Sequence, residues 1–389
     1  MIQVDRQAFM DEGYVIVRKI IQPDRLEPLR QSIEKVVYRE WPEGIPEAAF
    51  QPRVHGFSRH IDESNADLAK LIYAENVLDV IRQLMCVDDV GLAGDYLMCN
   101  PVEDHGPWFW HRDFSPVTEG PLQGSEIDFA ANGPNYLQWN IPLYDDDVLW
   151  VVPGSHRRAN TDQENRQMGA VPHGYAHGQQ PQGEKRHEPL PCSLCVALKA
   201  GDGVVYTNRL LHWGSNYSSK LRRCIHLGYR AFGSQSNYHQ GYQRDFPAAE
   251  QLSTPQRAYL ERLALLYDRE CDATEAVLRA ILDRDEAPFH ESLAKLHPGK
   301  TGRFSALIHL CKLAGAIRHG KDPEYGRRFT QDEAEMLGRC FAALDQALQT
   351  EAEQYMPGFL LAGPTRYRQY DLPPDFGMDE FVASWNQAY

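Results

Sequence analysis

Residues 108–113 read WFWHRD and place a His-x-Asp pair, His111 and Asp113, at the end of an aromatic run. Side chains of a β-strand alternate between two faces, so this imidazole and carboxylate share one face where the segment ends a strand. Two such groups side by side can occupy adjacent positions on one metal ion. The segment therefore predicts a metal site in a fold built mainly of strands.

A third ligand is predicted much further along the chain. Residues 208–215 read NRLLHWGS and contain His212, far enough from His111 for several strands to bring the two together. Two histidines and one carboxylate leave three positions of an octahedral metal open, which is diagnostic of non-haem Fe(II) oxygenases. Catalytic zinc with two histidines and a carboxylate is the competing interpretation, and the ligands alone do not separate the two metals.

Short apolar runs outline the fold around this site. Gly, Pro, Asn and Asp clusters separate the runs, as turns require. Because no long helix intervenes, the runs favour an antiparallel sandwich or barrel over a parallel α/β sheet. We expect strands over residues 15–17, 90–99, 135–143, 149–152, 195–198, 203–207 and 222–230, and a helix that starts near Pro23.

Helix signals dominate the chain after residue 250, so we divide it into a β-rich domain, 1–240, and an α-helical C-terminal region, 241–389. Each apolar stripe in this region needs a partner surface, so we expect the region to pack on the β domain. Four helices are expected, starting at Thr254-Pro255, starting at a capping box of Asp272 and Glu275, running along 304–314, and starting at Thr330 with Glu333.

Composition narrows the class of protein. The 389 residues carry a formal net charge of −14, which argues against unaided binding of nucleic acid or of an anionic membrane surface. Mean hydropathy is −0.52, and no apolar run is long enough to span a bilayer. The eight cysteines are scattered and the N-terminus lacks a signal-peptide pattern, so we expect a cytoplasmic protein without a disulfide framework.

Five segments, taken in order, resemble the phytanoyl-CoA dioxygenase family of Fe(II)/2-oxoglutarate-dependent oxygenases. The resemblance runs from about residue 9 to residue 232 and leaves the helical region uncovered. The segments are FMDEGYVIV at 9–17, the His111/Asp113 pair, WNIPLYDD at 139–146, VPGSH at 152–156, and GDGVVY at 201–206 leading to His212.

The resemblance implies a double-stranded β-helix, a cupin-like jelly-roll barrel, with iron held by His111, Asp113 and His212. It also implies an arginine after the distal histidine that binds the far carboxylate of 2-oxoglutarate, because a guanidinium binds a carboxylate bidentately. Arg222 and Arg223 compete for this role. Arg222 shares a strand face with Cys224 and His226, whereas Arg223 shares the more apolar face, so strand parity favours Arg222. Ser215 and Trp139 are further cofactor-binding candidates.

The function implied is a dioxygenase that couples oxidative decarboxylation of 2-oxoglutarate, with O2, to C–H oxidation of a small organic substrate. Hydroxylation is the expected outcome. Two alternatives remain open: a catalytically inactive jelly-roll protein that binds a ligand, and a metal-dependent cupin-like enzyme that does not use 2-oxoglutarate. The helical region is a candidate surface for homo-oligomer formation, and the sequence does not identify the substrate.

Four weaker signals favour ordinary structural roles. Asp145-Asp146-Asp147 is typical of a solvated turn, and His156 of a turn that satisfies backbone groups. Cys192 and Cys195 form a lone C-x-x-C pair without a second pair at zinc-binding spacing. His226 is equally consistent with a pocket residue and with a hydrogen-bonded core histidine.

Overall fold

The computed structural model describes the chain in several stretches. The described residues are 2–42, 53–99, 110–113, 133–158, 161–168, 188–214, 221–232, 246, 248–283, 285, 287–289, 291–292, 310, 313–320 and 324–341. The helices with defined bounds are α1 (Arg6–Glu12), α2 (Pro23–Glu40), α3 (Asp67–Ile72), α4 (Glu75–Met85), α7 (Asp162–Met168) and α8 (Thr254–Asp283). The 3-10 helices are η2 (Phe57–His60), η3 (Glu63–Asn65), η5 (Ser155–Arg157), η7 (Ala249–Gln251) and η8 (Tyr325–Arg327). The strands are β1 (Tyr14–Val17), β2 (Arg53–His55), β3 (Val90–Cys99), β4 (Tyr136–Pro142), β5 (Leu149–Val151), β6 (Leu194–Cys195), β7 (Gly203–Thr207), β8 (His212–Gly214) and β9 (Arg223–Ala231).

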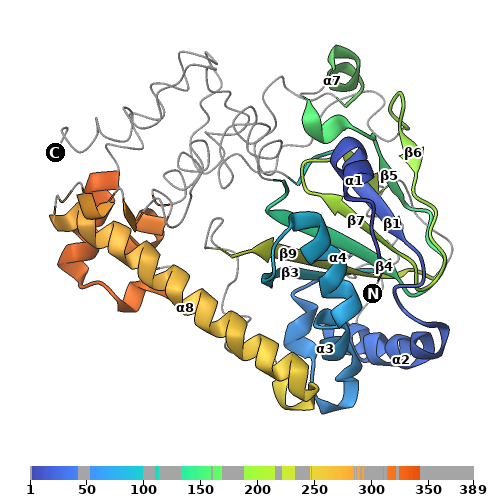
Figure 1. Ribbon diagram of the computed structural model, residues 1–389, viewed down its shortest axis with the longest axis horizontal. Helices are drawn as coiled ribbons and strands as arrows, with labels where there is room; N and C mark the ends of the chain where they lie inside the picture. The colour runs from blue at the N-terminus through green and yellow to red at the C-terminus, as the bar shows by residue number, and fades with distance from the viewer. Residues whose placement is uncertain are drawn as a thin grey trace.

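The strands form two antiparallel sheets (Figure 1). The larger sheet has the order β1-β7-β4-β9-β3-β2 and the smaller one β6-β5-β8. From β3 onward the chain crosses between them: β3, β4, β7 and β9 lie in the larger sheet, and β5, β6 and β8 in the smaller. This crossing pattern is that of a jelly roll, which confirms the predicted fold class. The described strands form two layers rather than a closed barrel.

One face of the larger sheet, here called the outer face, is a dry core. It carries the odd-numbered residues of β4 and β9, such as Trp139, Ile141 and Leu227, which are fully buried. They belong to the same apolar cluster as Ile33 of α2 and Leu78 of α4. The helices therefore cover this face, because each needs to bury the apolar stripe that its sequence places on one side.

The opposite face of the larger sheet, here called the inner face, looks toward the smaller sheet. Near β7 it is apolar, and Val204 and Tyr206 pack with Leu149 and Val151 of β5. Further along the sheet, β4 and β9 place polar side chains on this face, because Gln138 and Asn140 alternate with the outer-face residues. The polar part of the inner face is where the candidate site lies.

The motif at residues 9–17 folds into α1, a tight turn and β1. Gly13 ends α1 with a left-handed φ of 84°, and its N–H donates to the carbonyl of Phe9. A Cβ on Gly13 would come within 2.5 Å of Nδ1 of His156, so glycine is required twice, for conformation and for space. The backbone of Gly13 therefore lies close to the ring of His156, which places the N-terminal motif next to the Pro-Gly-Ser-His turn.

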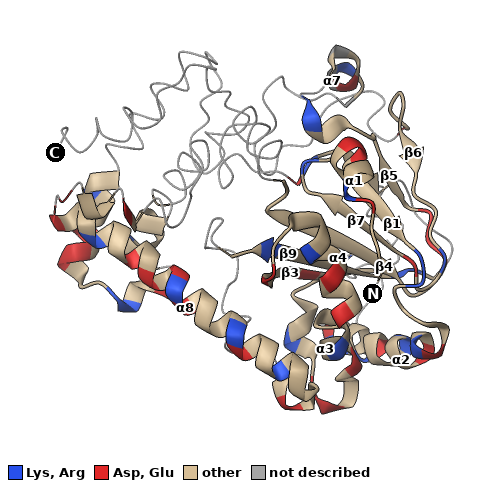
Figure 2. Ribbon diagram, viewed as in Figure 1, with Lys and Arg blue, Asp and Glu red and all other residues tan. Residues whose placement is uncertain are grey.

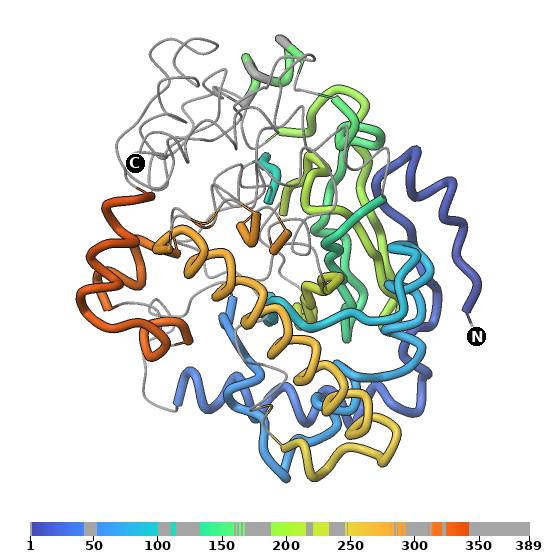
Figure 3. The backbone as a smooth tube through the Cα atoms, turned by 60° about the vertical axis from the view of Figure 1, so that its left-hand side comes forward, coloured from blue at the N-terminus to red at the C-terminus, as the bar shows by residue number. Residues whose placement is uncertain are grey.

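The first turns of α8 pack on the N-terminal helices (Figure 3). The side-chain amide of Gln256 donates to the carbonyls of Lys70 and Tyr73, both at 2.9 Å. The hydroxyl of Tyr259 bonds the backbone N–H and carbonyl of Val90, both at 3.0 Å. The start of α8 therefore packs on the part of the molecule that covers the sheet, and packing of the rest of the helical region stays a prediction. The domain boundary near residue 240 stays a prediction.

The prediction of a new helix at Asp272 is wrong, because α8 runs without interruption for 30 residues, from Thr254 to Asp283. The two acids instead bind Arg328, Asp272 at 3.2 Å and Glu275 at 2.6 Å, and so tie a later segment to α8. The helix start at Thr254 is confirmed. The reciprocal capping box of Thr330 and Glu333 is also confirmed, and residues 331–341 are helical behind it. Most of the expected helix at 304–314 lies outside the described residues.

Among the described helices, none has a stretch long and apolar enough to cross a membrane. Residues of both charge signs lie along α8 and in α2 and α3 (Figure 2).

Candidate metal centre

His111, Asp113 and His212 converge between the two sheets, as predicted from the sequence. His212 begins β8, which pairs with β5. His111 pairs with His212 as an isolated antiparallel bridge, in which each backbone N–H donates to the other carbonyl, at 3.0 and 2.9 Å. This bridge extends the smaller sheet by one position. The backbone itself therefore holds the two imidazoles side by side, with ring centroids 4.3 Å apart.

The carboxylate of Asp113 lies between the two imidazoles. Its Oδ1 is 3.3 Å from Nε2 of His111, and its Oδ2 is 3.3 Å from Nε2 of His212. Partial desolvation tends to raise the pKa of this carboxyl, but the neighbouring His212 and His111 imidazoles lower it well below its usual range. Asp113 is therefore an ionised ligand at neutral pH.

A hydrogen bond fixes how His212 presents its ring. Nδ1 of His212 lies 2.8 Å from the carbonyl of Leu210, so the Nδ1–H donates there and Nε2 is the nitrogen left to face Asp113 or a metal ion. Histidine ligands commonly hold their second nitrogen on a backbone carbonyl in this way, which sets the tautomer and the ring orientation. The same Nε2 faces Asp113.

Among the described residues, this triad is the group whose ligand atoms could hold a metal ion, and these atoms lie within 4.8 Å of one another. Two imidazoles and one carboxylate match the facial ligand set of non-haem iron and leave positions for a cosubstrate and dioxygen. The residues present therefore fit an iron centre. Asp113 is 36% exposed on its side chain, whereas His111 and His212 are 14% and 6% exposed, so the site opens on the side of the carboxylate.

Arg112, the middle residue of the His-x-Asp pair, has a structural role. The guanidinium of Arg112 donates to the carbonyls of Ser155, at 2.7 Å, and Arg158, at 3.2 Å, and also to that of Arg209. Successive side chains alternate in direction, so Arg112 points away from its two neighbours in the triad. It ties the short segment that carries His111 and Asp113 to η5 and to the segment that precedes β8.

Trp110, the last residue of the aromatic run, packs beside β8 against Trp213. Trp110 is 1% exposed, its ring lies 5.4 Å from that of Trp213, and its indole N–H donates to the carbonyl of Glu188 at 2.8 Å. Trp213 also lies near Trp150. These apolar rings pack beside the segments that carry His111 and His212. Trp108 and Phe109 lie outside the described residues.

Arg222 and Arg223 fall on opposite faces of the larger sheet. Arg223 makes a bidentate ion pair with Glu34 of α2, at 2.8 and 3.0 Å, on the outer face. The Nε–H of Arg222 donates to Oδ2 of Asp146 at 2.7 Å, and both side chains are largely buried. Arg222 therefore lies on the side of the triad, and Arg223 is held among the covering helices.

Of the two further cofactor-binding candidates from the sequence, the structure describes Trp139, and it lies away from the triad. Trp139 is fully buried in the outer-face core, opposite the polar residues of β4, and its ring lies against Gly203. The placement of Trp139 gives no support to a cofactor-binding role. Ser215 lies outside the described residues.

Of two residues that matter here, Gln138 was not singled out from the sequence and Asp146 was assigned a different role. Gln138 of β4 donates from Nε2 to Oδ2 of Asp113 at 2.7 Å. Asp146 is buried and paired with Arg222, so the expectation of a solvated turn is wrong at this position, although Asp145 does pair with Lys199 at the surface. A polar residue alternating with apolar ones along 137–141 was the available signal for Gln138.

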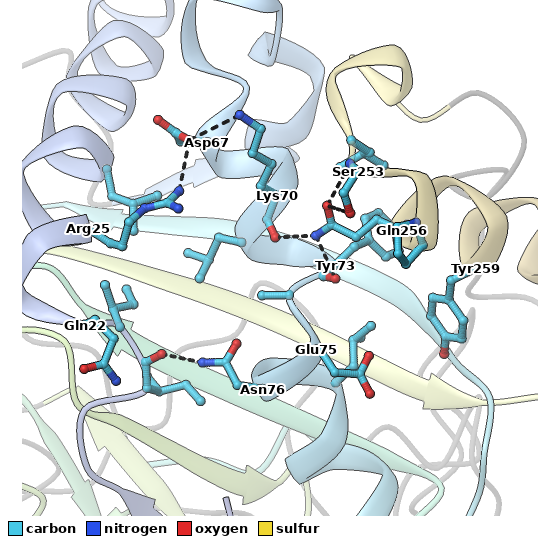
Figure 4. Close-up of a pocket in the computed structure, with 18 of the residues that line it drawn as sticks. Gln22, Arg25, Asp67, Lys70, Tyr73, Glu75, Asn76, Ser253, Gln256 and Tyr259 are labelled. Carbon is cyan, nitrogen blue, oxygen red and sulfur yellow. Dashed lines mark hydrogen bonds and ion pairs between the residues drawn. The ribbon is translucent and has the colours of Figure 1, made fainter. Parts of the chain in front are cut away.

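A cavity of about 920 Å³ lies elsewhere, between α2, α3, α4 and the start of α8 (Figure 4). Its walls combine apolar side chains such as Leu29 and Leu71 with ion-paired ones, including Arg25 bound to Asp67 at 3.0 Å. The sheet separates this cavity from the inner face, and none of the triad residues lines it. It is therefore not the place where the predicted chemistry occurs.

Comparison with known proteins agrees with the sequence motifs. The family model described as phytanoyl-CoA dioxygenase matches residues 9–224. AviO1 from Streptomyces viridochromogenes Tue57 is 20% identical, with a TM-score of 0.41 over 59% of this chain and 97% of its own. SnoK, a non-heme alpha ketoglutarate dependent carbocyclase from nogalamycin biosynthesis, is 19% identical, with a TM-score of 0.41 over 58% of this chain and 83% of its own. EctD from S. alaskensis, solved with 2-oxoglutarate and 5-hydroxyectoine, is 18% identical, with a TM-score of 0.42 over 58% of this chain and 75% of its own.

Among curated proteins, no sequence matches the chain significantly. The family model, by contrast, covers more than half of the 389 residues, and its range includes all three members of the triad. The chain belongs to the phytanoyl-CoA dioxygenase family and is an oxygenase, and the triad within the matched range could hold a metal ion.

Proposed function

We propose that this protein is an Fe(II)- and 2-oxoglutarate-dependent dioxygenase that oxidises a C–H bond of a small organic substrate, with hydroxylation as the outcome. One observation carries the proposal: two histidines and a carboxylate from distant segments meet with their ligand atoms within 4.8 Å. Family membership supplies the reaction class, and the fold by itself does not choose the substrate.

In this proposal His111, Asp113 and His212 hold the metal. The backbone bridge between the two histidines and the Leu210 carbonyl fix the imidazoles before the metal arrives, so little rearrangement is needed on binding. When bound, iron supplies the activation of dioxygen that couples decarboxylation of 2-oxoglutarate to substrate oxidation. The Trp110 and Trp213 rings behind β8 exclude water from that side of the site.

We further propose that Arg222 binds the far carboxylate of 2-oxoglutarate. Strand parity puts it on the same face as His226 and the site, and its Nε–H bond to Asp146 holds the guanidinium in one orientation. Arg223 has its fork committed to Glu34 on the other face. A planar guanidinium anchored at one edge suits bidentate recognition of a carboxylate.

The protein's setting is inferred from its cysteines and its charge. The seven described cysteines form no disulfide, which supports a reducing compartment, the cytoplasm. The formal net charge of −14 supports a small-molecule substrate rather than nucleic acid or a membrane surface. Homo-oligomer formation through the helical region is a further proposal, and light scattering of a chain truncated near residue 245 tests it.

The proposal is tested by anaerobic titration of the metal-free protein with Fe(II) and then 2-oxoglutarate. We expect a saturable visible metal-to-ligand charge-transfer band, because the 2-oxo acid chelates the metal. His212→Ala removes one ligand and should abolish both the band and substrate-dependent succinate formation. His60→Ala is the matched control, since His60 bonds Glu40 at 2.9 Å in η2 and is absent from the triad.

The possible results separate the proposed function from its alternatives. Iron binding without the band would leave a metal site and exclude 2-oxoglutarate, in favour of another metal-dependent cupin-like enzyme. A chain that binds no iron would point to a jelly roll that only binds a ligand. Succinate formation that persists in His212→Ala would remove His212 from the metal centre.

A further inference from the structure

A chain of buried polar side chains leads away from the candidate metal centre along the inner face. Gln138 of β4, His226 of β9 and Asn140 of β4 are 3%, 3% and 5% exposed. Asn140 and His226 are directly opposite each other in the sheet, and Gln138 lies one pleat further along β4. None of the three is a member of the triad. Since buried polar groups weaken a fold unless they are paired, their pairing shows what they do.

The hydrogen bonds connect these residues in one order. Nε2 of Gln138 lies 2.7 Å from Oδ2 of Asp113 and 3.2 Å from Nε2 of His226. Nδ1 of His226 lies 2.7 Å from Oδ1 of Asn140. The series therefore runs from Asn140 through His226 and Gln138 to the ligand carboxylate.

Donor and acceptor chemistry determines the orientation of every group in the series. A carboxylate only accepts, so Gln138 must turn its NH2, and not its oxygen, toward Asp113. The second hydrogen of that NH2 then donates to Nε2 of His226, which must be unprotonated. His226 consequently carries its hydrogen on Nδ1 and donates it to Asn140.

The amide of Gln138 satisfies its two donors and leaves its acceptor unused. Oε1 of Gln138 is buried and has no hydrogen-bond partner among the described residues. An unsatisfied buried oxygen lowers stability, so a residue chosen for stability alone would not be placed in this way. The arrangement instead gives both N–H groups to fixed targets, one of which is the ligand.

His226 is itself held rigidly on both sides. The ring of Tyr96 packs against it at a centroid distance of 5.5 Å, and the ring of Tyr206 lies at 6.3 Å. Tyr206 also contacts His212 edge-on at 5.1 Å. The histidine that anchors Gln138 is therefore fixed by packing as well as by its bond to Asn140.

We propose that Gln138 is a positioning residue for the metal centre, holding the Asp113 carboxylate between the two imidazoles, and that His226 and Asn140 hold Gln138. This proposal rests on the proposed function, because it assumes that the triad binds a metal. Outer partners of this kind commonly change metal affinity by about 10- to 100-fold when they are removed.

The test measures Mn(II) binding to the full-length protein by calorimetry, so that no turnover is needed. Gln138→Leu keeps the buried volume and removes both donors, and we expect its Mn(II) affinity to fall by about 10- to 100-fold. The thermal midpoint of the metal-free variant should change little, because an unsatisfied buried oxygen is removed while Nε2 of His226 loses its donor. Ser58→Ala is the matched control, since it removes a buried 3.1 Å side-chain bond to Asp95 on the outer side.

A pair of substitutions at His226 gives an independent readout. His226→Gln can accept from Gln138 through its oxygen and donate to Asn140 through its nitrogen, as the imidazole does. We expect it to keep Mn(II) affinity close to that of the unmodified protein, whereas His226→Leu loses affinity. A role in packing alone would predict the same result for both variants.

Two outcomes contradict the positioning proposal and leave the proposed function standing, and a third contradicts both. Gln138→Leu binding Mn(II) as tightly as the unmodified protein would overturn it. Equal affinity of His226→Gln and His226→Leu would overturn the role of the series beyond Gln138. Absence of Mn(II) binding by the unmodified protein, or equal binding by His212→Ala, would overturn the metal centre itself and the positioning role with it.

Discussion

The two faces of the larger sheet are made by neighbouring residues and serve different ends. On the outer face, Trp139, Ile141 and Leu227 are fully buried against helices and form a dry core. On the inner face, Gln138 and His226 are just as buried but form hydrogen bonds that lead to a ligand carboxylate. Burial alone therefore does not separate structural from functional residues in this protein, and strand parity does.

The same division separates two adjacent arginines. Arg223 points to the outer face and makes an ion pair with Glu34, whose side chain is 44% exposed. Arg222 points to the inner face and pairs with Asp146, whose side chain is 6% exposed. One residue of separation along the chain thus changes the environment from a helix surface to the side of the site, because side chains alternate at every step.

The largest expected effect on stability comes from the outer face. Trp139→Ala leaves a cavity in the dry core and should lower the free energy of unfolding by about 3–5 kcal/mol, as measured by urea denaturation. Trp139→Phe keeps most of the ring and removes an indole N–H that has no partner among the described residues, so it should cost much less. The fraction of Trp139→Ala that is folded should bind Mn(II) normally. Loss of Mn(II) affinity by the folded variant would contradict the assignment of Trp139 to a purely structural face.

Arg222 and Arg223 allow the two faces to be compared at adjacent positions of the chain. Arg222→Gln can still donate to Asp146 but loses the charged fork, and we expect 2-oxoglutarate to bind roughly 100-fold more weakly. Arg223→Gln breaks a partly exposed ion pair and should leave 2-oxoglutarate affinity unchanged, with a stability loss of about 1 kcal/mol or less. Titration of the charge-transfer band measures both variants. If Arg223→Gln is the variant that loses affinity, the parity argument fails.

The smallest effect concerns a buried histidine that belongs to neither face. Burial lowers the pKa of His156 to about 4, and its Nε2–H donates to the carbonyl of Met10. Below pH 6.5 the unfolded chain takes up a proton that folded His156 does not, so stability falls as the pH drops from about 6.5 toward 4. Between pH 7 and pH 5, we expect His156 to lower the free energy of unfolding by an amount on the order of 2 kcal/mol. Unfolding of His156→Gln, measured at both pH values, should lack this contribution.

That variant also tests the division of roles. Glutamine at position 156 can still donate to the Met10 carbonyl, so the turn should persist and Mn(II) affinity should not change. An acid sensitivity identical to that of the unmodified protein would mean that His156 is solvated rather than buried. Altered metal affinity would place the turn in the site.

Much of the fold was predictable because its signals are local. The runs at 90–99 and 203–207 match β3 and β7 in full, since apolar runs bounded by turn residues report strands directly. The start of α8 at Thr254 was predictable for the same reason. The capping box at Asp272 was misread because acids at this spacing also serve long-range ion pairs, and the partner here is Arg328, far along the chain.

Some features of the site were likewise predictable from the sequence, and others depended on the tertiary structure. The sequence alone predicted which three residues would come together, because His-x-Asp and a distal histidine are the groups that a metal of this kind selects. It also placed Arg222 and His226 on one face by parity. The tertiary structure alone decided that Asp146 is buried against Arg222, that Trp139 faces the core, and that Gln138 reaches Asp113. These outcomes depend on which strands become neighbours, and strand pairing is set by the packing of the whole sheet rather than by any local run.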